Sequence, residues 1–264
     1  RQRQMCIRDS FMGIGVMMIA HGLQMQLMGI RSVLEGFSVL TTGIFMSGYY
    51  VGYFIGSKTT PNFVSKVGHI RVFAAFASLA SLSALLAVVY VNPIMWTLSR
   101  FVTGVSLVSC YVVTESWLND RATNKNRGQL LSAYMMVIFF GLAIGMLLLN
   151  VSEPKNYEPF ILVSVLLSIA LVPILLTKRP APKFKKIETI SIVELYKISP
   201  LGTFSSFFTG VIHAAFFSLI SVYATLAKLS LLETSVLLFI ATIAGVLGQG
   251  PIGYLSDKYD RRTV

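Results

Sequence analysis

A few polar side chains that could carry out chemistry lie inside long apolar stretches of this sequence. Arg100 stands within the run Ile94–Trp117. An arginine at membrane depth costs at least about 2.5–3.5 kcal/mol on insertion scales, so it must face a cavity or a partner, or extend toward the interface. We therefore expect Arg100 either to take part in substrate binding or proton handling, or to snorkel to the outer interface.

Four further polar residues extend this set. Glu115 lies near the end of the same run, and is either a proton-responsive group or a structural partner for Arg121 or for a neighbouring cytoplasmic helix end. His21 and Gln24 lie about one turn apart on one helix face. His213 lies in a later apolar run. Since histidine titrates near neutral pH, both histidines are candidates for binding substrate or relaying protons, and a helix–helix hydrogen bond is the structural alternative.

The composition indicates that these groups lie in a membrane. The 264 residues are 55% hydrophobic and only 12% charged, whereas a soluble domain is nearer a quarter charged. Too few charges are present to cover a soluble surface, so we expect the lipid bilayer to be a partner. The net charge of +11 does not indicate nucleic acid in so apolar a chain. Two cysteines cannot form a disulfide framework.

Eight apolar stretches are long enough to cross a hydrocarbon layer of about 30 Å, which takes roughly 20 helical residues. They are Phe11–Ile30, Gly36–Gly56, Val72–Val91, Ile94–Trp117, Gln129–Asn150, Glu158–Thr177, Pro200–Ala227 and Leu232–Gly250. The predicted fold class is all-α, a polytopic membrane helical bundle.

The basic residues predict how this bundle is oriented. Eighteen of the 22 Lys and Arg residues flank one side of the predicted spans, three lie in the opposite loops, and Arg100 is inside a span. Cytoplasmic loops carry the excess of positive charge, so both ends of the chain are predicted to be cytoplasmic. The polar, basic residues 1–10 are predicted to be a non-native or disordered tail. The predicted orientation stays the same when these residues are left out.

These features divide the chain into four segments. They are the tail 1–10, a six-helix bundle 11–177, a basic cytoplasmic linker 178–199, and the start of a second bundle 200–264. The second bundle holds two helices and the following loop, so we expect the chain to be a C-terminally truncated fragment of a longer protein.

An internal repeat supports this division. Residues 61–71 and 253–262 follow even-numbered spans and align at an offset of 192 residues. His21 and His213 are separated by the same 192 residues. Six spans fall in one period, as expected of a transporter built from two parallel halves.

The second of these segments resembles the loop signature of the major facilitator superfamily, Gly-x-Leu-(Ala/Ser)-Asp-(Arg/Lys)-x-Gly-Arg-(Arg/Lys). The matching positions are Gly253, Leu255, Ser256, Asp257, Lys258, Arg261 and Arg262. Asp260 stands where the last glycine usually is. The first segment departs more and keeps Lys66, Gly68 and Arg71. In the family the segment is a conformational latch between cytoplasmic helix ends of the two halves, and a solvated loop that only sets topology is the alternative.

The fourth span carries a second resemblance. Arg100-x-x-x-Gly104 resembles the family's fourth-helix motif, an arginine linked to substrate binding or proton coupling. Glu115-Ser-Trp-Leu-Asn119 and the later Gln249-Gly-Pro-Ile-Gly253 resemble the YcaD-like branch of the superfamily. The resemblance implies the superfamily fold in the inner membrane, with a complete N-terminal six-helix half and the first two helices of the C-terminal half. It implies a full-length protein that is a monomer.

The fifth span holds Gly141-x-x-x-Gly145. Antiporter branches carry a longer glycine-rich motif with a Gly-Pro step here, and this chain lacks the proline. Close helix packing through small residues accounts for the two glycines. The missing proline argues against a drug:proton antiporter, without excluding one.

The predicted function is secondary transport. The sequence has no phosphate-binding loop, no His-Glu-x-x-His zinc motif, no paired-cysteine metal site and no nucleophile elbow. We therefore expect no enzyme activity, cofactor or metal. The prediction is a secondary active transporter that moves a small solute by alternating access, coupled to protons, in either direction. The alternative is a non-transporting membrane sensor or scaffold with the same fold.

Overall fold

The computed structural model describes residues 2–122, 127–176 and 191–259, and helices make up nearly all of these ranges. The helices are α1 (Gln2–Leu34), α2 (Val39–Val67), α3 (His69–Val89), α4 (Pro93–Arg121), α5 (Arg127–Leu147), the 3₁₀ turn η1 (Leu148–Asn150), α6 (Glu158–Ile169), α7 (Leu171–Leu175), α8 (Ile192–Ile198), α9 (Pro200–Leu226) and α10 (Leu231–Lys258). The described ranges contain no strand, which confirms the all-α prediction.

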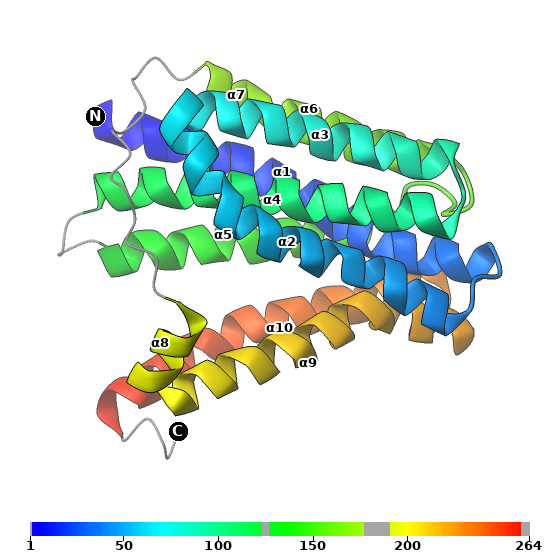
Figure 1. Ribbon diagram of the computed structural model, residues 1–264. Helices are drawn as coiled ribbons and strands as arrows, with labels where there is room; N and C mark the ends of the chain where they lie inside the picture. Colours follow the sequence, from blue (N-terminus) through cyan, green and yellow to red (C-terminus); the bar gives the residue numbers. More distant parts are fainter. Residues whose placement is uncertain (1, 123–126, 177–190, 260–264) are drawn as a thin grey trace.

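The helices form one bundle and a separate hairpin (Figure 1). Helices α1 to α7 lie side by side along a common direction. Helices α9 and α10 form the hairpin, which contacts α1, α2 and α5. The hairpin approaches the bundle where α9 meets α10 and diverges from it toward the end where α1 begins and α10 ends.

Seven described helical stretches are long and apolar enough to cross a membrane, judged by length and composition. The prediction of eight spans is thus confirmed for seven. Helix α2 is the exception, although it has 29 residues and packs along α4 in the same bundle. Its glycines, tyrosines and hydroxyl side chains lower its mean hydropathy, and these same residues take part in packing and in the cavity described below.

Two predicted segments differ from the structure, and a third lies largely outside the described residues. Helix α1 extends back to Gln2, so the tail 1–10 is helical from that residue instead of disordered, while its non-native origin stays a prediction. The sixth span is split into α6 and α7 at Ala170. Pro173 explains the break, because proline has no N–H to donate to the carbonyl four residues earlier, at Ile169. Residues 177–190 of the predicted linker lie outside the described residues, and its last part forms α8.

Glycines set how closely α2 and α4 approach. Gly48, Gly52 and Gly56 recur every four residues along α2 and so share one face. A Cβ atom built on Gly52 would lie 2.1 Å from the carbonyl oxygen of Phe101 on α4. Gly104 of α4 is equally tight, since its Cβ would lie 2.0 Å from the carbonyl oxygen of Tyr49. The backbones of the two helices therefore touch, as small residues permit in membranes.

The same device joins α1 to α5. A Cβ atom on Gly145 would lie 2.1 Å from the carbonyl oxygen of Ile19, and one on Gly141 would lie 2.8 Å from that of Gly15. The predicted role of this glycine pair in close helix packing is confirmed. These contacts fix the depth and rotation of four helices that surround the cavity.

Candidate functional site

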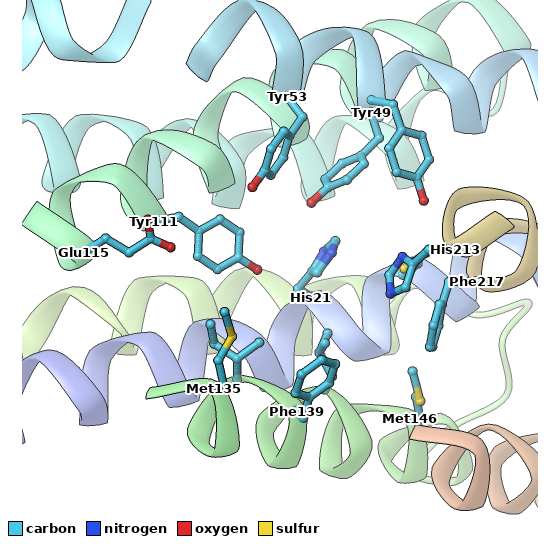
Figure 2. Close-up of a pocket in the computed structure, with 14 residues that line it drawn as sticks. His21, Tyr49, Tyr53, Tyr111, Glu115, Met135, Phe139, Met146, His213 and Phe217 are labelled. Carbon is cyan, nitrogen blue, oxygen red and sulfur yellow. The ribbon is translucent and has the colours of Figure 1, made fainter. Parts of the chain in front are cut away.

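A cavity of about 340 Å³ lies between the bundle and α9 (Figure 2). Five helices contribute to its wall. The lining residues are His21 and Met25 of α1, Tyr49, Tyr50 and Tyr53 of α2, Tyr111 and Glu115 of α4, Met135, Ile138, Phe139, Leu142 and Met146 of α5, and His213 and Phe217 of α9. Aromatic and methionine side chains dominate this wall, and a few polar groups are set among them, as is usual for small-molecule sites.

The structure brings His21 and His213 to one cavity. Their side chains approach it from α1 and α9, although 192 residues separate them (Figure 2). The His21 ring stacks on Tyr49 with a centroid distance of 5.2 Å. The His213 ring lies 4.4 Å from that of Phe217. Both histidines are thus held by aromatic neighbours, and the two halves of the predicted repeat meet here.

Glu115 lies toward the other end of the cavity, beside Tyr111 (Figure 2). The hydroxyl of Tyr134 donates a hydrogen bond of 3.4 Å to its Oε1. Within the described part of the chain the carboxylate has no cationic partner at ion-pair distance. The predicted alternative partner, the side chain of Arg121, lies outside the described residues. Glu115 is therefore an acid that faces the cavity.

Arg100 does not line the cavity but lies directly behind its wall. It is 0% exposed, and its Cζ lies 4.8 Å from the centroid of the Tyr49 ring. None of its Nε, Nη1 and Nη2 atoms has a hydrogen-bond partner among the described residues. Complete enclosure by protein does not fit the snorkelling alternative. The structure fits the other prediction, that Arg100 faces a partner. This partner is the ring of Tyr49, which contacts the guanidinium by a cation–π interaction in place of a hydrogen-bond acceptor.

Two predicted pathway residues also lie away from the cavity wall. Gly104 packs α4 on the backbone of Tyr49, so its part is to allow close approach. Gln24 is 1% exposed, and its Nε2 lacks a partner in the described ranges. Three residues of helix turn a side chain about 60° from that of His21, which is enough to take Gln24 off the wall.

The predicted latch segments are mostly helical and not loops. Helix α2 continues through Lys66 to Val67 and is capped by Gly68, whose φ of 86° favours glycine. Arg71 lies in the first turn of α3. Gly253, Asp257 and Lys258 belong to the last turns of α10. Arg261 and Arg262 lie outside the described residues. Helices α2 and α10 extend beyond the apolar stretches predicted to cross the membrane, because a helix can continue from the membrane into water.

The tyrosines of α2 were not predicted as site residues. The centroid distances along the wall are 5.1 Å from Tyr50 to Tyr49, 6.1 Å from Tyr49 to Tyr53, and 6.3 Å from Tyr53 to Tyr111. The signal that could have found them is the spacing of three tyrosines among glycines, since these residues break the apolar character of α2. The aromatic and methionine residues of α5 carry no such signal, because they match the apolar span around them.

The family follows from comparison with known proteins. A model of the Major Facilitator Superfamily matches residues 10–264. The chain belongs to this superfamily. The predicted superfamily fold is confirmed. Relatives include proteins named "Uncharacterized MFS-type transporter YcaD". That of Escherichia fergusonii is 28% identical over 226 residues, which is 84% of this chain and 59% of the relative.

The YcaD of Escherichia coli O9:H4 (strain HS) is also 28% identical, over 232 residues that cover 87% of this chain and 61% of the relative. The chain thus spans about three fifths of the length of these relatives. Among solved structures, a mutant of the nucleoside transporter NupG superposes with a TM-score of 0.75 and 11% identity over 98% of this chain and 69% of NupG. At that identity the likeness shows the fold alone.

Proposed function

We propose that the full-length protein is a secondary active transporter that moves a small solute across the inner membrane by alternating access. The observation that carries this proposal is the origin of the cavity wall. Helices α1, α2, α4 and α5 of the first half contribute to it, and so does α9 of the second. A solute bound there touches both units, which must rock against each other around the site.

The contacts between the two units lie near one end. Tyr50 and Ser218 share a hydrogen bond of 3.3 Å, and Asn150 donates one of 2.7 Å to Ser235. Residues 204–212 of α9, nearer the other end, are all exposed. The predicted orientation puts that open end in the cytoplasm. The proposal therefore describes this arrangement as closed on the outside and open inward.

Proton coupling is the finer part of the proposal, and Glu115 is its candidate group. The carboxylate faces the cavity and, among the described residues, accepts a hydrogen bond of 3.4 Å and forms no ion pair, so binding and release of a proton would not require breaking an ion pair with them. We expect Glu115→Gln to lower substrate-dependent proton flux by roughly tenfold or more, as loss of a proton-transfer group typically does. Full-length protein in proteoliposomes, screened with solutes under an imposed pH gradient, measures this.

Glu153→Gln is the matched control, because Glu153 is an exposed acid in the loop before α6 and should leave the flux unchanged. Equal flux in the wild type and Glu115→Gln would refute the role of Glu115. Solute flux that ignores the pH gradient would refute proton coupling but keep transport. Solute binding without any flux would favour the sensor alternative.

The latch stays a proposal for the end of α10. A carboxylate at Asp257 near the start of a neighbouring helix gains about 0.3–1 kcal/mol from the helix dipole. We expect Asp257→Asn to lower transport severalfold and to bias the protein toward inward opening, measured by cysteine-accessibility labelling. Glu194→Gln, which removes an exposed acid of α8, should change neither quantity. Unchanged transport by Asp257→Asn would refute the latch and leave this segment only a role in setting the topology.

A further inference from the structure

The guanidinium of Arg100 is buried and lacks a hydrogen-bond acceptor among the described residues. Arginine carries five N–H donors in a planar fork. At Arg100 all three nitrogens are enclosed, and none has an acceptor in the described part of the chain. In the membrane interior an unsatisfied polar group carries a large cost in free energy. An ionisable group that carries this cost inside a membrane typically marks a functional site, where a ligand can supply the missing partner.

The Tyr49 ring is what separates Arg100 from the cavity. The ring lines the cavity and receives the guanidinium at 4.8 Å. The backbone of Tyr49 is pinned, because Gly104 allows α4 to touch its carbonyl oxygen. The side chain of Tyr49 points into the cavity (Figure 2). Rotation of this side chain would open Arg100 to a bound solute while the helices stay in place.

The rest of the wall indicates the chemistry of such a solute. Among the described lining residues there is no lysine or arginine, so Arg100 would supply the one permanent positive charge close to the cavity. Glu115 does not cancel it, since 15 residues of α4 place it about 22 Å further along the helix. Side chains such as Met25, Phe139 and Phe217 suit an aromatic or apolar body.

We propose that Arg100 is the anion-binding group of the solute site, that Tyr49 covers it, and that the solute is a carboxylate carried on an aromatic or apolar body. The planar guanidinium matches a carboxylate through two parallel hydrogen bonds. The incoming carboxylate supplies the missing acceptors and displaces the Tyr49 ring from the guanidinium. This proposal rests on the proposed function, because it takes the cavity to be the solute site.

Three probes with one aromatic body test the charge preference. Calorimetry on full-length protein in detergent would compare 2-naphthoate, 2-naphthamide and 2-naphthylmethylammonium. We expect naphthoate to bind at least about tenfold more tightly than the other two, as a charge-assisted pair warrants. Arg100→Gln should abolish that preference, and Arg100→Lys should keep part of it.

Substitutions of Tyr49 test whether its ring covers Arg100, because a purely structural role of Tyr49 would not predict tighter binding of naphthoate. Tyr49→Ala removes the cover, so naphthoate binding should strengthen about threefold or more, by the cation–π contact that no longer has to be broken. Tyr49→Phe keeps the ring and should bind naphthoate as the wild type does. Melting temperatures of all variants would show that each is folded, and Arg100→Lys serves if Arg100→Gln is not.

Several outcomes would overturn the proposal. They are tighter binding of the cation than of naphthoate, no binding of naphthoate to the wild type, an anion preference that survives Arg100→Gln, and equal weakening of all three probes by Tyr49→Ala. Transport of a cationic solute would overturn it while the proposed transport function stands. Naphthoate binding that depends on Arg100, in a protein that moves no solute, would support this site while the transport function fails.

Discussion

Replacing Arg100 with methionine is expected to raise the melting temperature of the protein and to abolish transport. The guanidinium is 0% exposed and has no hydrogen-bond acceptor among the described residues. Replacing buried charges with apolar side chains of similar volume is often stabilising by about 1–4 kcal/mol. Transport should fall by two orders of magnitude or more, as about 3 kcal/mol of lost binding implies. Thermal unfolding in detergent and uptake by proteoliposomes measure the two quantities.

Arg31→Met is the matched control. Arg31 is also a buried arginine, near the end of α1, but its guanidinium has partners. It forms an ion pair of 2.6 Å with Glu35 and donates to the carbonyl oxygens of Pro154 and Lys155. Its replacement should therefore lower the melting temperature. If Arg100→Met lowered it by a comparable amount, Arg100 would be a structural residue and our interpretation of its unpaired state would be wrong.

Substituting Gly52 with alanine should destabilise the first half of the protein severely. The added Cβ would lie 2.1 Å from the carbonyl oxygen of Phe101, a backbone atom that cannot move without α4. Overpacking typically costs about 1–3 kcal/mol, and we expect the upper end or more because two backbones must separate. Tyr49 and Tyr53 flank Gly52 on α2, so solute binding should be lost as well. The unfolding midpoint in detergent checks the first effect.

Gly43→Ala separates packing from helix propensity. Gly43 lies on the same helix, and a Cβ atom there meets nothing within 4 Å. Alanine should stabilise a helix at such a position by up to about 1 kcal/mol relative to glycine. Opposite signs for the two substitutions would support backbone contact between α2 and α4, whereas two changes of the same sign and size would exclude it.

Part of the site could be predicted from the sequence. His21, His213 and Glu115 stand out as polar groups in apolar runs, and the structure places all three on the cavity wall. Arg100 stands out for the same reason but lies one layer behind the wall. Met135 and the other α5 residues of the wall could not be found, because an apolar side chain facing a cavity and one facing lipid look alike in sequence.

The sequence by itself determined the membrane class, the order and approximate limits of the helices, and the family. These follow from the length of apolar runs and the placement of basic residues, and lipid leaves a spanning segment of this kind only the helix as a way to pair its backbone. Only the tertiary structure decided that Tyr49 stands between Arg100 and the cavity. The physical reason is that the rotation and depth of α2, α4, α1 and α5 are set by contacts such as Gly52 with Phe101, between residues far apart in the chain.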